Sequence, residues 1–157
     1  MNTARPAKIA DIEELINLMS DFYEDSGYKL NIELSRRALR TIIANPELGR
    51  VWLLEHKNQI AGYVVLTLVF SMEYGGVCAF VDDFFIRAGF RRLGLGSVGM
   101  DALLAECRQR GVRAVNIEVG RDNLPAKEFY ASFGFNELNP DRQTVTLKIE
   151  NETSTAA

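Results

Sequence analysis

One stretch, VDDFFIRAGFRRLGLGSVG from Val81 to Gly99, constrains the fold more than any other part of the chain. It reads as an apolar strand, a basic loop with glycines and the start of a helix, in immediate succession. Backbone N–H groups at a helix start have no partner within the helix, and they carry the positive end of its dipole. Glycines at that point let an anion approach the main chain closely. The stretch therefore predicts an anion-binding loop in a domain of mixed α and β elements.

Two glycine patterns overlap in this loop, and each implies a different ligand. Gly94, Gly96 and Gly99 fit G-x-G-x-x-G, which is typical of dinucleotide-binding folds. Glu118 supports that interpretation, because it lies about twenty residues beyond the glycines, where an acid that binds ribose would stand. Residues 87–93 count against it, because a dinucleotide fold needs the strand to run almost directly into the first glycine. Only one unit of strand, helix and strand can follow, so dinucleotide binding is the weaker alternative.

The composition indicates an ordinary globular protein of one domain, with 157 residues, 47% of them hydrophobic and 25% charged. The N-terminal residues lack the apolar core of a signal peptide. The longest apolar run, Ile60 to Phe70, is too short to span a membrane as a helix. We therefore expect a cytoplasmic protein without a membrane partner. Cys78, Cys107 and the single histidine, His56, show no metal-ligand spacing, so no metal is expected.

Charge is spread unevenly along the chain. The net charge is −3, which argues against a general nucleic-acid binder. From Ile86 to Lys127, however, eight Arg or Lys residues stand against four Asp or Glu residues, so this part carries +4 and the remainder −7. The basic part is the part with the glycines. This asymmetry suits a polyanionic ligand at one edge of an acidic protein.

The other elements are predicted from hydrophobic periodicity and turn signals. The predicted helices are Asp11 to Tyr23, a second helix that contains Leu34 to Ile43, Gly96 to Arg110, and Asn123 to Ser132. The predicted strands are Val51 to Glu55, Ile60 to Phe70, Val77 to Ile86, Ala114 to Val119, Gly134-Phe135, and Arg142 to Lys148. Residues 151–157 have no apolar face and are expected to be a disordered tail.

Two signatures at a matching separation resemble the GNAT superfamily of acyl-CoA-dependent N-acetyltransferases. The first is R-x-x-G-x-G at Arg91, Gly94 and Gly96, and the second is RDNLPAKEFYASFGF from Arg121 to Phe135. The resemblance extends from Met1 to Lys148. It implies an α/β (mixed α+β) fold in one domain over residues 1–150, with a central, mostly antiparallel twisted sheet of six to seven strands and about four helices. The family often forms dimers, so a homodimer is a further expectation.

The resemblance implies acetyl-CoA as cosubstrate, with its pyrophosphate on the glycine loop and its pantetheine arm along the strand that ends at Ile86. The loop amides and nearby arginines match the charge of coenzyme A. The amide of Ile86 would polarise the thioester carbonyl. The residues expected to bind the cofactor are Phe84, Phe85, Ile86, Arg91, Arg92, Leu93, Gly94, Leu95, Gly96, Ser97, Asn123, Ala126, Lys127 and Tyr130. In this interpretation Gly99 allows the helix to pack closely and is not a third residue of the ligand-binding pattern.

Tyr130 matches the general acid of the family. When an amine attacks a thioester, a nearby acid lets the thiolate leave as a thiol. The alternative is that Phe129 and Tyr130 only pack in a core. Asn123 could cap the short helix that follows it, contact the pantetheine arm, or do both.

The ammonium of an acceptor must lose a proton, and Asp82, Asp83 and Glu118 are the candidate bases. Strand alternation places Asp82 and Asp83 on opposite faces unless a bulge intervenes, so only one of them would point into a cleft. Asp82 is slightly preferred. Two acids inside an apolar strand are costly unless they have a use or an arginine partner.

The VDDFFI-R context is most similar to the polyamine and diamine acetyltransferases, which favours a small cationic amine as acceptor. Glu24, Asp82 and Asp83 would bind it, and a lysine or N-terminal amine of a peptide stays open. Ala88-Gly89, where the family usually has a turn with proline, and Leu93 depart from its pattern. A non-catalytic module that binds acyl-CoA is the alternative of another class. It would need neither Tyr130 nor a carboxylate near the thioester.

Overall fold

The computed structural model describes residues 1–149, which fall into two compact units, residues 1–118 and the residues from 119 onward. The elements of the first unit are β1 Asn2–Pro6, α1 Ile12–Asp25, α2 Ile32–Ala44, β2 Gly49–His56, β3 Gln59–Ser71, β4 Gly76–Ile86, α3 Leu95–Gln109 and β5 Val115–Ile117, with short 3-10 turns at Ile9–Asp11 and Ala88–Phe90. The second unit contains α4 Leu124–Ser132. The expected disordered tail at residues 151–157 lies outside the described residues.

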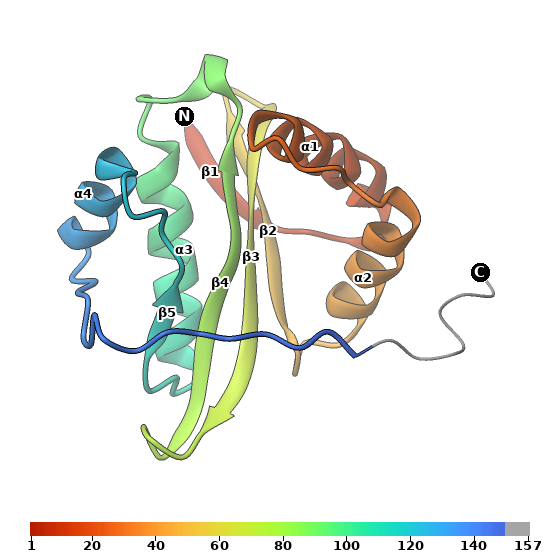
Figure 1. Ribbon diagram of the computed structural model, residues 1–157. Helices are drawn as coiled ribbons and strands as arrows, with labels where there is room; N and C mark the ends of the chain where they lie inside the picture. Colours follow the sequence, from red (N-terminus) through yellow and green to blue (C-terminus); the bar gives the residue numbers. More distant parts are fainter. Residues whose placement is uncertain (150–157) are drawn as a thin grey trace. The chain divides into compact units, whose positions relative to one another are not determined.

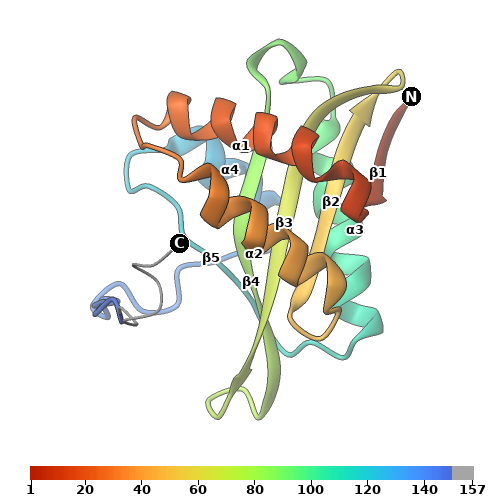
Figure 2. The same ribbon diagram turned by 90° about the vertical axis from the view of Figure 1, so that its right-hand side faces the viewer.

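A single sheet organises the first unit. Its strand order is β1-β2-β3-β4-β5, in which the first four strands are antiparallel and β5 is parallel to β4. Helices α1 and α2 cover one face and α3 covers the other (Figures 1 and 2). The predicted mixed and mostly antiparallel sheet between helices is therefore confirmed.

Each face of the sheet has its own apolar core. Leu15 and Leu18 of α1 pack with Tyr63 on one face, and Met100 and Leu103 of α3 are fully buried. Gly99 allows the close approach of α3, because a Cβ there would meet Phe84 Cζ at 3.0 Å and Leu54 Cδ2 at 3.1 Å. Its predicted role in helix packing, as opposed to ligand binding, agrees with these contacts.

Local sequence explains where the elements that lead to the site begin and end. Lys57 and Asn58 have φ of 49° and 64°, the left-handed pair that a tight two-residue hairpin needs between β2 and β3. Asn31 caps α2, where its side chain accepts from the Leu34 N–H at 3.1 Å. Gly111, with φ of 71°, follows the end of α3. These signals are local, and the predicted helices and hairpin agree with the structure.

The predicted number of strands is wrong for the described residues, which form five strands and not six to seven. The segments Gly134-Phe135 and Arg142 to Lys148 are not strands. Val145 and Leu147 alternate as a strand would, yet they are 90% and 83% exposed. Alternation fixes which residues share a face, but a strand exists only where a partner takes its backbone hydrogen bonds.

No pattern in the sequence predicts β1, which lies at the edge of the sheet. Its residues are mostly polar and end in Pro6, a residue that central strands exclude but an edge strand accepts. Pairing with β2, from Asn2 opposite His56 to Pro6 opposite Trp52, supplies its backbone hydrogen bonds. In the described part of the chain, no helix is long and apolar enough to cross a membrane, and no cluster of His, Cys, Asp and Glu could hold a metal.

Candidate active site

A β-bulge in β4 decides how its two acids lie. Val65 of β3 pairs with Asp83 and Leu66 pairs with Val81, so Asp82 is the extra residue between them. A bulge breaks strict alternation. Asp82 is exposed, whereas Asp83 is half-buried on the same face as Val65, which belongs to the core under α1 and α2. The prediction that Asp82 and Asp83 point to opposite faces by strand alternation applies only where no bulge intervenes, and a bulge is present here.

Asp83 has a specific partner that the sequence did not indicate. The hydroxyl of Tyr63, a fully buried residue of β3, donates a hydrogen bond of 2.8 Å to Asp83 Oδ2. Burial raises the pKa of Asp83 above its ordinary value, the Tyr63 bond opposes the rise, and the charge of Asp82 adds to it. The Asp83 carboxyl therefore binds a proton more readily than an exposed aspartate does.

Tyrosines around Asp83 respond to its charge. Burial raises the pKa of Tyr63, and the Asp83 carboxylate raises it further. Burial also raises the pKa of Tyr23, on α1, and the charges of Asp83 and Asp82 add to that rise. Phe22 of α1 stacks on Phe85 with ring centroids 5.2 Å apart. The half-buried carboxyl of Asp83 is thus bonded to one neutral phenol and lies within electrostatic range of a second, and partial burial strengthens such effects.

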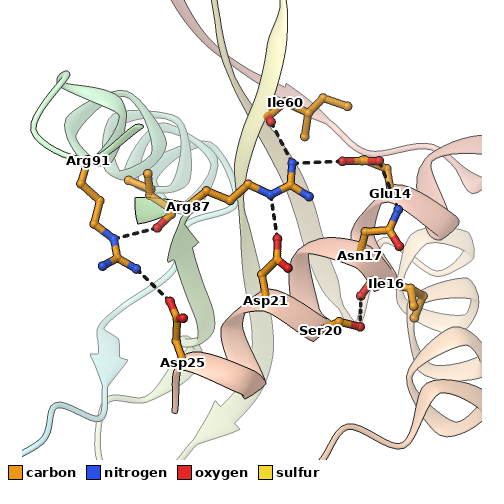
Figure 3. Close-up of polar contacts among 10 residues, drawn as sticks. Glu14, Ile16, Asn17, Ser20, Asp21, Asp25, Ile60, Arg87 and Arg91 are labelled. Carbon is orange, nitrogen blue, oxygen red and sulfur yellow. Dashed lines mark hydrogen bonds and ion pairs between the residues drawn. The ribbon is translucent and has the colours of Figure 1, made fainter. Parts of the chain in front are cut away.

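A cavity of about 250 Å³ lies at the end of β4, and three of its six lining residues carry a carboxylate. Its lining residues are Asp21, Glu24, Asp25, Phe85, Arg87 and Ala88. Figure 3 shows Arg87 bridging the strand end to α1, with Nε 2.8 Å from Asp21 and Nη1 3.4 Å from Glu14. Glu24 has no ion pair among the described residues. It is therefore the cavity carboxylate whose charge is not neutralised.

The glycine loop joins β4 to α3 through two left-handed residues, Arg92 at φ 65° and Gly94 at φ 85°. Gly94 is the N-cap of α3 and has no side chain that could occupy the N–H groups of the first turn. Arg91 turns away from these groups toward α1. Its Nε donates to the Ile86 carbonyl at 2.9 Å and its Nη2 lies 3.2 Å from Asp25 (Figure 3).

The direction of the Ile86 amide follows from its neighbour. The Arg87 N–H donates to the Ala61 carbonyl of β3 at 2.8 Å. Because consecutive amides of a strand point to opposite sides, the Ile86 N–H points away from β3. On that side β5 pairs with β4 only from Ala79 to Val81. Within residues 1–118, the last residues of β4 therefore present backbone groups that no strand takes.

Glu118 directly follows β5 and is exposed. Ile117 is the partner of Val81 in the parallel pair, so the backbone places Glu118 beside the bulge at Asp82. The first unit thus brings all three candidate bases to the same part of the sheet. Only Asp83 is partly buried there, whereas Asp82 and Glu118 are exposed.

The second unit contains the helix of the second signature. Asn123 caps α4, where its Oδ1 accepts from the Ala126 N–H at 3.3 Å. Tyr130 contacts the rings of Phe129 and Phe135 at centroid distances of 5.3 Å and 5.8 Å. Burial raises the pKa of Tyr130, so its phenol keeps its proton. The capping role of Asn123 is confirmed, and its contact with pantetheine stays a prediction.

Two residues of the site were missed from sequence. Tyr63 lies in an apolar run that predicts a buried strand, and nothing in that run shows that its hydroxyl meets Asp83. Arg87 follows β4 directly, but its partners Glu14 and Asp21 are far away in sequence. A buried tyrosine near a strand with two acids is the one signal that was available, since a buried phenol usually finds a partner.

Residues 12–135 match the acetyltransferase (GNAT) family. The chain belongs to this family. An integron cassette protein, HFX_CASS3, from the mobile metagenome of Cole Harbour Salt Marsh is 37% identical, with 95% of this chain and 91% of that chain covered and a TM-score of 0.84. No curated protein matches the chain.

More distant solved structures share the fold. A predicted acetyltransferase from Clostridium acetobutylicum, solved with acetyl-CoA, is 19% identical over 93% of this chain and 96% of that chain, with a TM-score of 0.77. An aminoglycoside acetyltransferase, meta-AAC0020, from an uncultured soil metagenomic sample is 16% identical over 94% and 97%, with a TM-score of 0.76.

Family membership bears on the overlap of the two glycine patterns. The chain is therefore an acyl-CoA-dependent N-acetyltransferase. Membership of this family favours the pattern R-x-x-G-x-G at Arg91, Gly94 and Gly96 over the dinucleotide pattern. The loop fits the cofactor, because the first-turn amides behind Gly94 suit a pyrophosphate.

Proposed function

We propose that this acetyltransferase moves the acetyl group of acetyl-CoA to a primary amine of a small cationic acceptor of the polyamine type, by direct attack of the amine on the thioester. The observation that carries the proposal is the acidic cavity at the end of β4. An ammonium group of the acceptor would lie near Glu24, whose charge no cation of the described residues neutralises. A lysine or N-terminal amine of a peptide is the second acceptor class.

Asp83 is our candidate for the base, ahead of Asp82 and Glu118. It is half-buried and held by Tyr63, whereas the other two carboxylates are exposed. A base works best when its pKa approaches the working pH, and burial moves the pKa of Asp83 in that direction. Asp83 would take the ammonium proton directly or through a water. Asp82 and Glu118 would add negative charge for the acceptor.

The end of β4 supports the proposed role of Ile86. Its N–H points away from β3, toward the side on which β5 has already ended. Such an amide can donate to a thioester carbonyl, and the neighbouring backbone can pair with an extended pantetheine arm in the manner of an added strand. Phe84 and Phe85 would lie along that arm.

The glycine loop would hold the pyrophosphate with its backbone. The proposed ligands are the amides from Leu93 to Ser97, with Arg91 and Arg92 adding positive charge. Arg91 would have to exchange its contacts with Asp25 and the Ile86 carbonyl for the cofactor. Ala126, Lys127 and Asn123 at the start of α4 keep their proposed cofactor contacts on the resemblance alone.

Tyr130 is the proposed acid that returns a proton to the departing thiolate. A raised pKa suits this role, since the phenol is fully protonated before the reaction. Tyr130→Phe should lower kcat by about a hundredfold, in keeping with the usual contribution of general acids. Phe129→Leu is the control, because it changes the neighbouring ring without removing a proton donor. If Tyr130→Phe turns over like the natural protein, Tyr130 is not the acid.

A panel of amines tests the acceptor class. Acetyl-CoA is mixed with diamines, polyamines, lysine peptides and peptides with free N-termini, and release of the coenzyme A thiol is followed. We expect kcat/KM to be highest for polyamines and to fall in Glu24→Gln. Faster turnover of the peptides would assign the site to the second acceptor class.

A further inference from the structure

The side chain of Asn2, on the edge strand β1, links the only histidine to the glycine loop. Asn2 Nδ2 lies 2.7 Å from the Leu93 carbonyl oxygen, and Asn2 Oδ1 lies 2.7 Å from His56 Nδ1. Both bonds join residues far apart in sequence. His56 in turn contacts the ring of Phe90, in the same loop, with centroids 6.2 Å apart. The loop is thus attached at two points to the β1-β2 edge.

The donor and acceptor groups fix the direction of the two hydrogen bonds that join Leu93, Asn2 and His56. A carbonyl oxygen can only accept, so the amide nitrogen of Asn2 must face Leu93. The amide oxygen then faces His56, and Nδ1 of His56 must carry the proton that it donates.

The bond to Leu93 orients the peptide group between Leu93 and Gly94. In a trans peptide the carbonyl and the following N–H point in opposite directions. Holding the Leu93 carbonyl on Asn2 therefore fixes the direction of the Gly94 N–H. The left-handed φ of 85° at Gly94 adjoins this peptide, and the left-handed φ of 65° at Arg92 lies one residue before it. A Cβ at Gly94 would come within 3.4 Å of Asn2 Nδ2, so the amide packs directly against the loop.

We propose that Asn2, oriented by His56, is a positioning residue that holds the glycine loop in the conformation that binds the pyrophosphate of acetyl-CoA. Asn2 does not itself contact the cofactor in this proposal. It acts through the Leu93-Gly94 peptide, and its loss is felt as weaker cofactor binding with unchanged chemistry. The inference rests on the proposed assignment of the loop to the pyrophosphate.

Two variants test the link, and a third serves as a matched control. Asn2→Ala removes both bonds, and His56→Phe keeps the ring contact with Phe90 while it removes the donor that orients Asn2. Thr3→Ala is the control, because Thr3 is the next residue on β1 and its hydroxyl bonds to Glu55 at 3.4 Å, not to the loop. Kd for coenzyme A is measured by calorimetry, and KM and kcat by thiol release.

We expect Asn2→Ala to raise both Kd for coenzyme A and KM for acetyl-CoA by about three- to tenfold, the usual worth of one hydrogen bond. The value of kcat and KM for the amine should stay unchanged. His56→Phe should have a smaller effect in the same direction, and Thr3→Ala none. Equal Kd values for Asn2→Ala and Thr3→Ala would overturn the inference.

Amide NMR separates failure of this inference from failure of the loop assignment. In Asn2→Ala, the signals of residues 93–96 should shift and their exchange should accelerate, even without cofactor. If coenzyme A binds the natural protein but does not shift these signals, the loop is not the pyrophosphate site and both proposals fall. If coenzyme A shifts them in the natural protein and Asn2→Ala leaves the free loop unchanged, only the role of Asn2 falls.

Discussion

The acid-bearing part of β4 and the glycine loop that follows it are neighbours in sequence but are built in different ways. Around Asp83 the proposed functional groups are side chains, which lie at least partly buried under α1. The Tyr63 hydroxyl donates a hydrogen bond of 2.8 Å to the Asp83 carboxylate. In the loop the working groups are backbone amides, exposed at the start of α3 and set by left-handed residues. The first region depends on burial and the second on conformation, so single substitutions should affect them differently.

The largest expected effect comes from the enclosed carboxylate. Asp83→Asn should lower kcat by about a hundredfold or more, because it removes the proposed base while Tyr63 keeps an acceptor for its hydroxyl. Coenzyme A affinity should not change. Asp82→Asn, one residue earlier but exposed in the bulge, is the control and should lose far less. If Asp82→Asn or Glu118→Gln abolishes turnover and Asp83→Asn does not, the assignment of the base is wrong.

A substitution in the glycine loop should weaken cofactor binding and leave kcat nearly unchanged, the reverse of the effect expected for Asp83→Asn. Gly94→Ala forces a side chain into the left-handed region, at a cost of about 1–2 kcal/mol, and should weaken acetyl-CoA binding by about tenfold with kcat nearly unchanged. Gly89→Ala is the matched control, since a Cβ at Gly89 meets nothing within 4 Å. Isothermal titration with coenzyme A measures the difference. Equal affinity in the two variants would show that the conformation at Gly94 does not govern binding.

Stability against pH offers a smaller effect that is specific to the enclosed region. The pKa of Asp83 is raised in the folded protein, so the unfolded chain gives up this proton first. The stability that protonated Asp83 contributes is fully present below the pKa that this carboxyl has in the unfolded chain. It is lost as the pH rises through the pKa of Asp83 in the folded protein. Asp83→Asn should therefore remove part of the fall in Tm over that window. An identical dependence of Tm on pH in the variant would show that folding does not raise the pKa of Asp83.

The same contrast explains what the sequence could predict. The loop was predictable because left-handed turns and helix starts require glycine at fixed spacing, which is visible in Gly94 and Gly96. The cluster around Asp83 was predicted only as two acids in an apolar strand. The bulge at Asp82 and the hydroxyl of Tyr63 depend on register between strands, which no local pattern specifies. The link from Asn2 to Leu93 spans 91 positions and follows from sheet pairing alone.

The smallest expected effect concerns the partner of Asp83. Tyr63→Phe removes the hydrogen bond that holds the Asp83 pKa down, so that pKa should rise further and the acid limb of kcat/KM should move to higher pH. Tyr23→Phe is the control, because Tyr23 feels the charges of Asp83 and Asp82 but has no hydrogen bond to either among the described contacts. A pH profile measured with saturating acetyl-CoA isolates the carboxylate from cofactor binding. If the acid limb stays in place in Tyr63→Phe, the group that titrates is not Asp83, and Asp83 is then not the base.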